Sequence, residues 1–209
     1  MARNQVAPTR TNLLRAKGDL AFAQEGYELL EQKREILILE LKRFTARAIE
    51  AQRKADAELA AAFSALRQAE LCTGIAAVTF SALAVNIESQ ISLSERRVMG
   101  VGLPAVNLSL TERAPHYGPR GSSVWTDEAV RRFKNALTAL AVLAESRISV
   151  MRLAREIQKT VRRVNALEKI FIPEYKETLD YVTAALEEAD REAFSILKLV
   201  KDRLEARGR

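Results

Sequence analysis

The first third of the sequence carries one long apolar series at helical spacing. Alternating steps of three and four residues from Leu13 to Ala55 meet an apolar or aromatic side chain everywhere except at Arg34. After one extra four-residue step, the kind that locally unwinds a coiled coil, the series continues to Ala69. A helix with a single apolar stripe needs a partner in water. The pattern therefore predicts a helix over residues 9 to about 70 that pairs with a second long helix.

The partner is predicted from a matching series near the other end of the chain. This second helix is expected to begin near Thr126, where Thr126-Asp-Glu is typical of a helix start. Pro173 is expected to kink this helix or interrupt its hydrogen bonding. If the middle of the chain reverses direction, the two helices form an antiparallel coiled coil. The two predicted seams contain Leu13, Leu20, Tyr27, Leu30, Leu37, Leu41, Phe44, Val161, Val164, Leu179, Val182, Leu186, Ile196 and Val200.

Each predicted seam is interrupted by one charged residue, Arg34 in the first and Glu168 in the second. Matching Glu70 to about Asn135 places Arg34 opposite residues 168–174. The two charges would then face each other and fix the register. The alternative is that Arg34 simply extends its guanidinium out of the seam into water.

The middle of the chain follows a different pattern. Val85, Ile87, Ser89, Ile91 and Leu93 alternate with a period of two, which indicates a strand. Glycine and proline then punctuate residues 97–110, and a loop rich in both follows at 114–123. The fold class expected is mainly α, with two long terminal helices around a small, partly β head that holds a hairpin. The segments expected are 1–70, 71–126 and 127–209.

Charge and composition limit the possible functions. The net charge is +6, and the excess lies in residues 96–163, which hold 13 Lys and Arg against 5 Asp and Glu. This basic region has few aromatic residues, so nucleic-acid binding is disfavoured, and the excess suggests either a solvated belt or a docking surface for an acidic partner. The longest uncharged run, 71–87, is broken by polar residues, so neither a signal segment nor a direct membrane span is expected.

No pattern of catalytic residues is visible. The chain has no phosphate-binding loop, no cluster of Cys and His and no plausible catalytic triad. His116, the only histidine, lies in the predicted loop and is expected to have a simple loop role. Cys72, the only cysteine, is expected to be a small buried side chain and cannot form an internal disulfide. We therefore expect no enzyme activity, no cofactor and no metal.

Several stretches, in order along nearly the whole chain, resemble the D-subunit family of rotary V-type and archaeal-type ATPases. In the first helix they are Pro8-Thr9-Arg10, Leu14, Lys17, Leu20, Ala23, Gly26, Leu29-Leu30, Lys33-Arg34 and Leu37. In the head the resemblance lies in Met99-Gly100-Val-Gly-Leu103-Pro104. In the second helix it lies in Arg163-Val-Asn-Ala-Leu-Glu168, Ile172-Pro173, Leu197-Lys198 and Lys201.

This resemblance implies a non-catalytic rotor axle with no cofactor of its own. The family couples ATP hydrolysis or synthesis to ion transport, hydrogen ion transport included, by rotation. Its partners are the catalytic and regulatory nucleotide-binding subunits of a hexamer, a small F subunit on the shaft and a stalk adaptor of the membrane sector. The implied localisation is cytoplasmic, peripheral to the membrane. The alternative is a structural coiled-coil scaffold without an ATPase role.

The resemblance also suggests which residues meet the hexamer. The free ends of both helices would enter its central cavity. The expected contacts are Thr9, Arg10, Leu14, Lys17, Leu197, Lys198 and Lys201. They should be numerous, weak and partly charged, because the axle must turn past three repeats and exposed ion pairs are worth only about 0–1 kcal/mol each.

Overall fold

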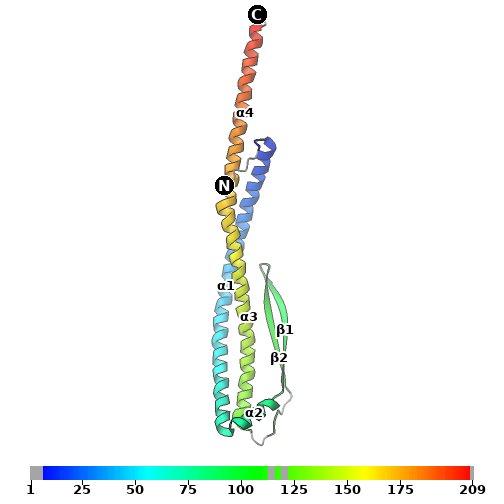
Figure 1. Cartoon of the computed structure of the whole chain (residues 1–209), viewed down its shortest axis with the longest axis vertical. Helices are drawn as coiled ribbons and strands as arrows, with labels where there is room; N and C mark the ends of the chain where they lie inside the picture. Colours follow the sequence, from blue (N-terminus) through cyan, green and yellow to red (C-terminus); the bar gives the residue numbers. More distant parts are fainter. Residues whose placement is uncertain (1–6, 113–115, 119–121, 208–209) are drawn as a thin grey trace. The chain divides into compact units, whose positions relative to one another are not determined.

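The computed structural model describes residues 7–112, 116–118 and 122–207, and this part of the chain is mostly helical. Its elements, in order, are α1 (Arg10–Thr73), α2 (Ile75–Ala84), β1 (Ile87–Val98), β2 (Val101–Glu112), α3 (Val124–Ala166), the π-helical segment η1 (Leu167–Phe171) and α4 (Ile172–Arg207) (Figure 1). The expected class, mainly α with long terminal helices and one hairpin in the middle, is confirmed. Parts of the expected loop, residues 114–115 and 119–121, lie outside the described residues.

The chain folds as two compact units, and each combines part of α1 with part of the second half of the chain. The terminal unit contains Met1–Arg34 and Lys159–Arg209, and the head unit contains Glu35–Gln158. These units cross the three segments expected from the sequence because helix pairing joins residues that lie far apart along the chain.

In the terminal unit α1 and α4 are antiparallel. Arg10, at the start of α1, lies 3.6 Å from Asp190, late in α4. Ala16 and Ala23 of α1 and Val182 of α4 are buried, and so is Val164 near the end of α3. The helix start predicted at Thr9 is confirmed, because the Asn12 amide donates to Thr9 Oγ1 at 3.2 Å.

The helical hydrogen bonding is interrupted just before Pro173, as predicted. The amide of Ile172 bonds to the carbonyl of Leu167, which closes a turn one residue wider than an α-turn. Pro173 has no N–H to donate to the preceding turn, so this segment cannot keep a regular α-helical ladder. The five-residue segment η1 separates α3 from α4 at this point.

In the head unit the core lies where α1, α3 and the tip of the hairpin meet. Leu37 and Phe44 of α1, Leu103 of β2 and Leu153 of α3 form one buried cluster. Farther along the same helix pair, Phe63 and Phe133 pack edge to face with ring centroids 5.5 Å apart. The predicted seam residues Leu37, Leu41 and Phe44 therefore do face a partner.

The expected register between the long helices is wrong. Matching Glu70 to Asn135 would put Phe63 opposite Val142, whereas its ring meets Phe133. The reason is that α1 continues to Thr73 and α3 begins as early as Val124, so the helices turn back on each other at these residues.

Three local expectations for the head also need correction. Residues 75–84, expected in a partly β region, form the helix α2. α3 begins near Thr126 as expected, but Thr126 lies inside the helix and does not cap it: the helix starts at Val124, and the Ser123 carbonyl accepts the Thr126 amide at 2.9 Å. Cys72 is exposed, because it falls between the inward-facing positions Ala69 and Thr73.

Candidate functional site

The last part of α4, residues 191–204, is an exposed helix in which seven of the fourteen residues are apolar and six are charged, and we call it the α4 tip. Phe194 is 72% exposed and Leu197 is 67% exposed. The other exposed apolar residues of the tip are Ile196, Leu199, Val200 and Leu204. Ile196 and Val200 were expected in the seam. They are exposed because α1 begins at Arg10, which already lies beside Asp190 (Figure 1).

The predicted contact residues all lie at these helix ends. Thr9, Arg10, Leu14 and Lys17 are exposed at the start of α1, and Leu197, Lys198 and Lys201 are exposed in the α4 tip. Sequence reasoning missed two further exposed side chains, Phe22 and Leu29. They follow Leu14 by eight and then seven residues, so the three lie on one face of α1. This second apolar series was readable in the sequence beside the first.

The charged residue in the first seam has a different partner from the one expected. Arg34 forms its ion pair with Glu31, one turn earlier on α1, at 2.6 Å. Tyr27 joins this group: its hydrogen bond with Glu31 raises the pKa of its phenol, and desolvation and the charge of Glu168 raise it further. Glu168 is therefore a neighbour of the group, although the ion pair between Arg34 and Glu31 lies within one helix.

The head motif forms the turn and the inner strand of the hairpin. Met99 and Gly100 occupy the two-residue turn with φ values of 48° and 80°. A positive φ at Met99 is uncommon for a residue with a side chain. Leu103 is buried in the core of the head unit, and Pro104 pairs with Glu95 of β1.

Two side chains of α3 attach the hairpin to the helix. The backbone amide of Val106 donates to Glu145 Oε2 at 2.9 Å, and Arg152 donates to the carbonyl of Gly102 at 2.7 Å. Sequence reasoning missed both contacts, because they join residues 39 and 50 positions apart.

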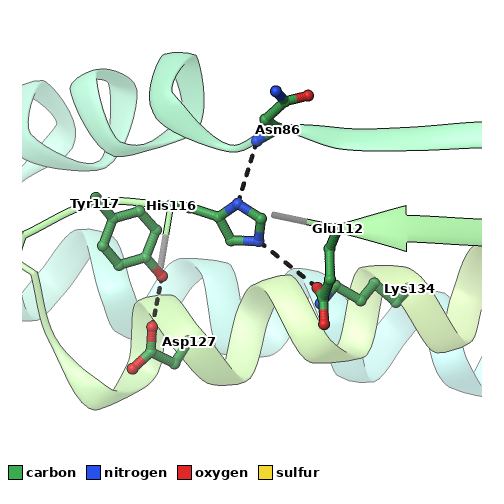
Figure 2. Close-up of polar contacts among 6 residues, drawn as sticks. All are labelled: Asn86, Glu112, His116, Tyr117, Asp127 and Lys134. Atoms are coloured by element: carbon green, nitrogen blue, oxygen red, sulfur yellow. Dashed lines mark hydrogen bonds and ion pairs between the residues drawn. The ribbon is translucent and has the colours of Figure 1, made fainter. Parts of the chain in front are cut away.

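Residues 116–118, a described part of the connection between β2 and α3, take part in a network of polar contacts (Figure 2). The Asn86 amide donates to His116 Nδ1 at 3.3 Å, and His116 Nε2 lies 3.6 Å from Glu112, which also contacts Lys134. Because Nδ1 accepts a hydrogen bond, Nε2 carries the proton in the neutral ring. The Tyr117 hydroxyl donates to Asp127 at 2.6 Å. His116 thus ties the loop to the base of the hairpin, which is a structural role.

The helix α2 and the end of α1 expose large apolar side chains in the head unit. Ile75, Phe80 and Leu83 of α2 are exposed, and so is Leu71 near the end of α1. Exposed large apolar side chains on two consecutive helices make this region a candidate for a protein contact. We call these four residues the α2 patch.

The described residues offer several exposed surfaces for binding. Within the described ranges, no group of three or more His, Cys, Asp or Glu side chains could hold a metal ion. None of the helices described is both long enough and apolar enough to cross a membrane. The candidate functional features are therefore the α4 tip, the exposed face of α1 and the α2 patch.

Comparison with known proteins gives matches over nearly the whole chain. Residues 12–202 match the family model of the ATP synthase D subunit. The D subunit of the A-type ATP synthase of Thermococcus sibiricus is 37% identical over 206 residues, which cover 97% of this chain and 96% of the relative. The corresponding proteins of Methanosphaera stadtmanae and Pyrococcus furiosus are 34% and 36% identical, with the same coverage of both chains.

Proposed function

Because the chain belongs to the ATP synthase D-subunit family, we propose that it is the non-catalytic central-stalk subunit, the axle, of a rotary ATPase. In this role it couples ATP hydrolysis or synthesis in a nucleotide-binding hexamer to ion transport, such as hydrogen ion transport, through a membrane sector. Family membership favours this function over a coiled-coil scaffold without an ATPase role. The observation that carries the proposal is the exposed apolar surface of the α4 tip.

The α4 tip has the surface expected of a helix enclosed by other subunits. A helix that is apolar on several sides is unfavourable in water and is normally buried. The central cavity of a ring of catalytic and regulatory subunits would cover it. Apolar attraction is not directional, so it can hold the tip without fixing one angle of rotation. Arg10, Lys17, Lys198 and Lys201 would add weak charged contacts around this apolar surface.

The axle transmits force through asymmetry and stiffness. A paired helical rod presents different side chains to three otherwise equivalent catalytic sites. Each site then favours the conformation that fits the face opposite it. Hydrolysis at one site shifts these preferences and biases rotation, and rotation imposed from the membrane sector drives the same steps in reverse. The nucleotide chemistry belongs to the hexamer, since the axle carries no phosphate-binding loop.

The head unit would connect the axle to the membrane sector. The α2 patch is an apolar surface suited to the stalk adaptor of that sector. The small F subunit would bind along the paired helices. The chain would then lie on the cytoplasmic side, held at the membrane through its partners.

The proposal is tested by making the α4 tip polar. In the free chain, Phe194→Ser with Leu197→Ser should leave thermal stability and helix content nearly unchanged, because both side chains are already exposed. In a reconstituted complex with the hexamer and the membrane sector, the same variant should lose most ATP-driven ion transport. The matched control, Phe194→Leu with Leu197→Met, keeps the surface apolar and should keep transport.

Full ion transport by the serine variant would contradict the axle assignment of this surface. Co-purification gives a second check. A tagged chain should retain nucleotide-binding subunits, whereas a scaffold without an ATPase role would not.

A further inference from the structure

β1 has an open edge along most of its length. The described strands form one two-stranded sheet, in which β1 pairs with β2 alone. Ten of the twelve β1 residues are exposed, and two of them are large apolar residues, Ile91 at 61% and Leu93 at 73%. An edge of this kind presents a row of unpaired N–H and C=O groups that another strand can bind.

The turn of the hairpin decides which backbone groups face this edge. Val98 pairs with Val101 across the two-residue turn. The residues that close such a turn exchange both backbone hydrogen bonds, and the pattern then alternates along the strand. Even-numbered residues of β1 therefore bond to β2. The odd-numbered residues, Ile91 and Leu93 among them, direct their N–H and C=O groups outward.

The outer edge of β2 is different because α3 and a proline occupy it. The Val106 amide is bound by Glu145, and the Gly102 carbonyl is bound by Arg152. Pro104, between them, has no N–H to offer. Val106 and Gly102 lie opposite odd-numbered β1 residues, which agrees with the alternation set by the turn. Of the two edges, the one on β1 is the edge available to another chain.

We propose that the free edge of β1 pairs antiparallel with β1 of a second copy of this chain, about a two-fold axis through Ser92. In this register Ile91 lies opposite Leu93 of the second copy, and Glu88 lies opposite Arg96 of the second copy. The symmetry makes each of these pairs twice. Both apolar and charge-opposite pairs across neighbouring strands are stabilising.

Neighbouring registers do not give this complementarity. An axis at Ile91 places Glu88 opposite Ser94, and an axis at Leu93 places it opposite Val98. Either shift also leaves Arg96 without an opposite charge. The Ser92 axis keeps the hydrogen-bonding alternation, since it matches odd-numbered residues with odd-numbered residues. This pairing is a property of the free chain and does not depend on the proposed rotary function.

The first test measures self-association of the full-length chain by analytical ultracentrifugation across a range of concentrations. The wild-type chain should form a reversible dimer. Arg96→Glu or Glu88→Arg alone should weaken dimerisation by about tenfold or more, because like charges then face each other twice. The double variant Glu88→Arg with Arg96→Glu should restore it. Arg97→Glu, which makes the same charge change opposite Ile87 of the second copy, should have little effect.

The second test is a cross-link at the proposed axis, in a Cys72→Ser background. Two copies of Ser92→Cys would form a pair without backbone hydrogen bonds, with Cα atoms about 4.5 Å apart, which a disulfide can span. Ser94→Cys is the control, because it would face Gln90 of the second copy. A monomer at all concentrations, a dimer insensitive to Arg96→Glu, no rescue by the double variant, or equal cross-linking at Ser94 would each overturn the proposal.

Discussion

Glu145 Oε2 on α3 accepts the backbone amide of Val106 at 2.9 Å, so a helix side chain completes the hydrogen bonding of β2. Arg152 does the same for the carbonyl of Gly102 at 2.7 Å. The two contacts hold the hairpin along α3 at two points of the same strand. They also explain why the outer edge of β2 carries no third strand among the described residues.

Removing the Glu145 carboxylate should loosen the hairpin. Glu145→Ala leaves the Val106 amide without its partner in a partly buried site, which we expect to cost about 1–3 kcal/mol. The amide of Val106 should then exchange its hydrogen faster by NMR, and the free energy of unfolding should fall. Glu145→Gln keeps an oxygen acceptor and should lose less. Equal effects of alanine and glutamine would show that this hydrogen bond does not hold the strand.

Tyr117 should make the head unit sensitive to alkaline pH. Burial raises the pKa of its phenol, and the hydrogen bond to Asp127 raises it further. Unfolded tyrosine titrates near pH 10. The stabilisation is therefore complete below about pH 10 and is lost as the pH rises above it, since the unfolded chain ionises first.

Urea unfolding at several pH values checks this expectation. Tyr117→Phe should be less stable than the wild type at neutral pH, and the difference should shrink above about pH 10. Tyr181→Phe, at an exposed position, is the control and should change stability little at either pH. A Tyr117→Phe difference that is the same at all pH values would contradict the argument.

The sequence was sufficient to predict the structure where one periodic pattern of apolar residues determined the packing. The seams were predicted because a residue such as Leu37 or Val182 recurs at helical spacing, and both are fully buried. The hairpin was predicted because alternation in β1 is followed by a glycine-containing turn. Local pattern could not identify α2, since its short, mostly apolar sequence shows no period that distinguishes helix from strand.

Long-range geometry lay beyond sequence reasoning. The register of the paired helices depends on where α1 ends and α3 begins. A small error in these two predicted bounds therefore displaces every predicted residue pair along the helices. The contacts of His116 and Glu145 join separate elements. No residue next to either one in the sequence indicates these contacts. The α4 tip was misjudged for another reason: its seam residues have the right spacing, but no partner helix in the described part of this chain extends that far.

Two glycines should respond to alanine with opposite signs. A methyl group at Gly18, inside α1, would meet no atom within 4 Å, so Gly18→Ala should stabilise the free chain by about 1 kcal/mol through helix propensity. Gly100 has a φ of 80° in the hairpin turn, where alanine should cost about 1–2 kcal/mol. Urea unfolding of both variants measures the two changes. Destabilisation by Gly18→Ala would mean that a neighbour approaches this part of α1.

Cysteine pairs can measure the register of the terminal unit. Tyr27 interacts with Glu168, and Arg10 pairs with Asp190, so Leu20 should lie opposite residues between Tyr175 and Asp180. In a Cys72→Ser background, Leu20→Cys should therefore form an intramolecular disulfide with Leu179→Cys or Tyr175→Cys. It should not do so with Ala193→Cys, which lies beyond the end of α1.

Leu14→Cys with Leu179→Cys is the matched control for this register, because Leu14 is exposed and faces away from the seam. Mass spectrometry of the oxidised, digested chain identifies the linked residues. Disulfides of Leu20→Cys that form mainly with Ala193→Cys would require the helices to slide by several turns relative to each other. Such a slide would separate Arg10 from Asp190 and draw the α4 tip back alongside α1, which would bury the apolar surface that the axle is proposed to present to the hexamer.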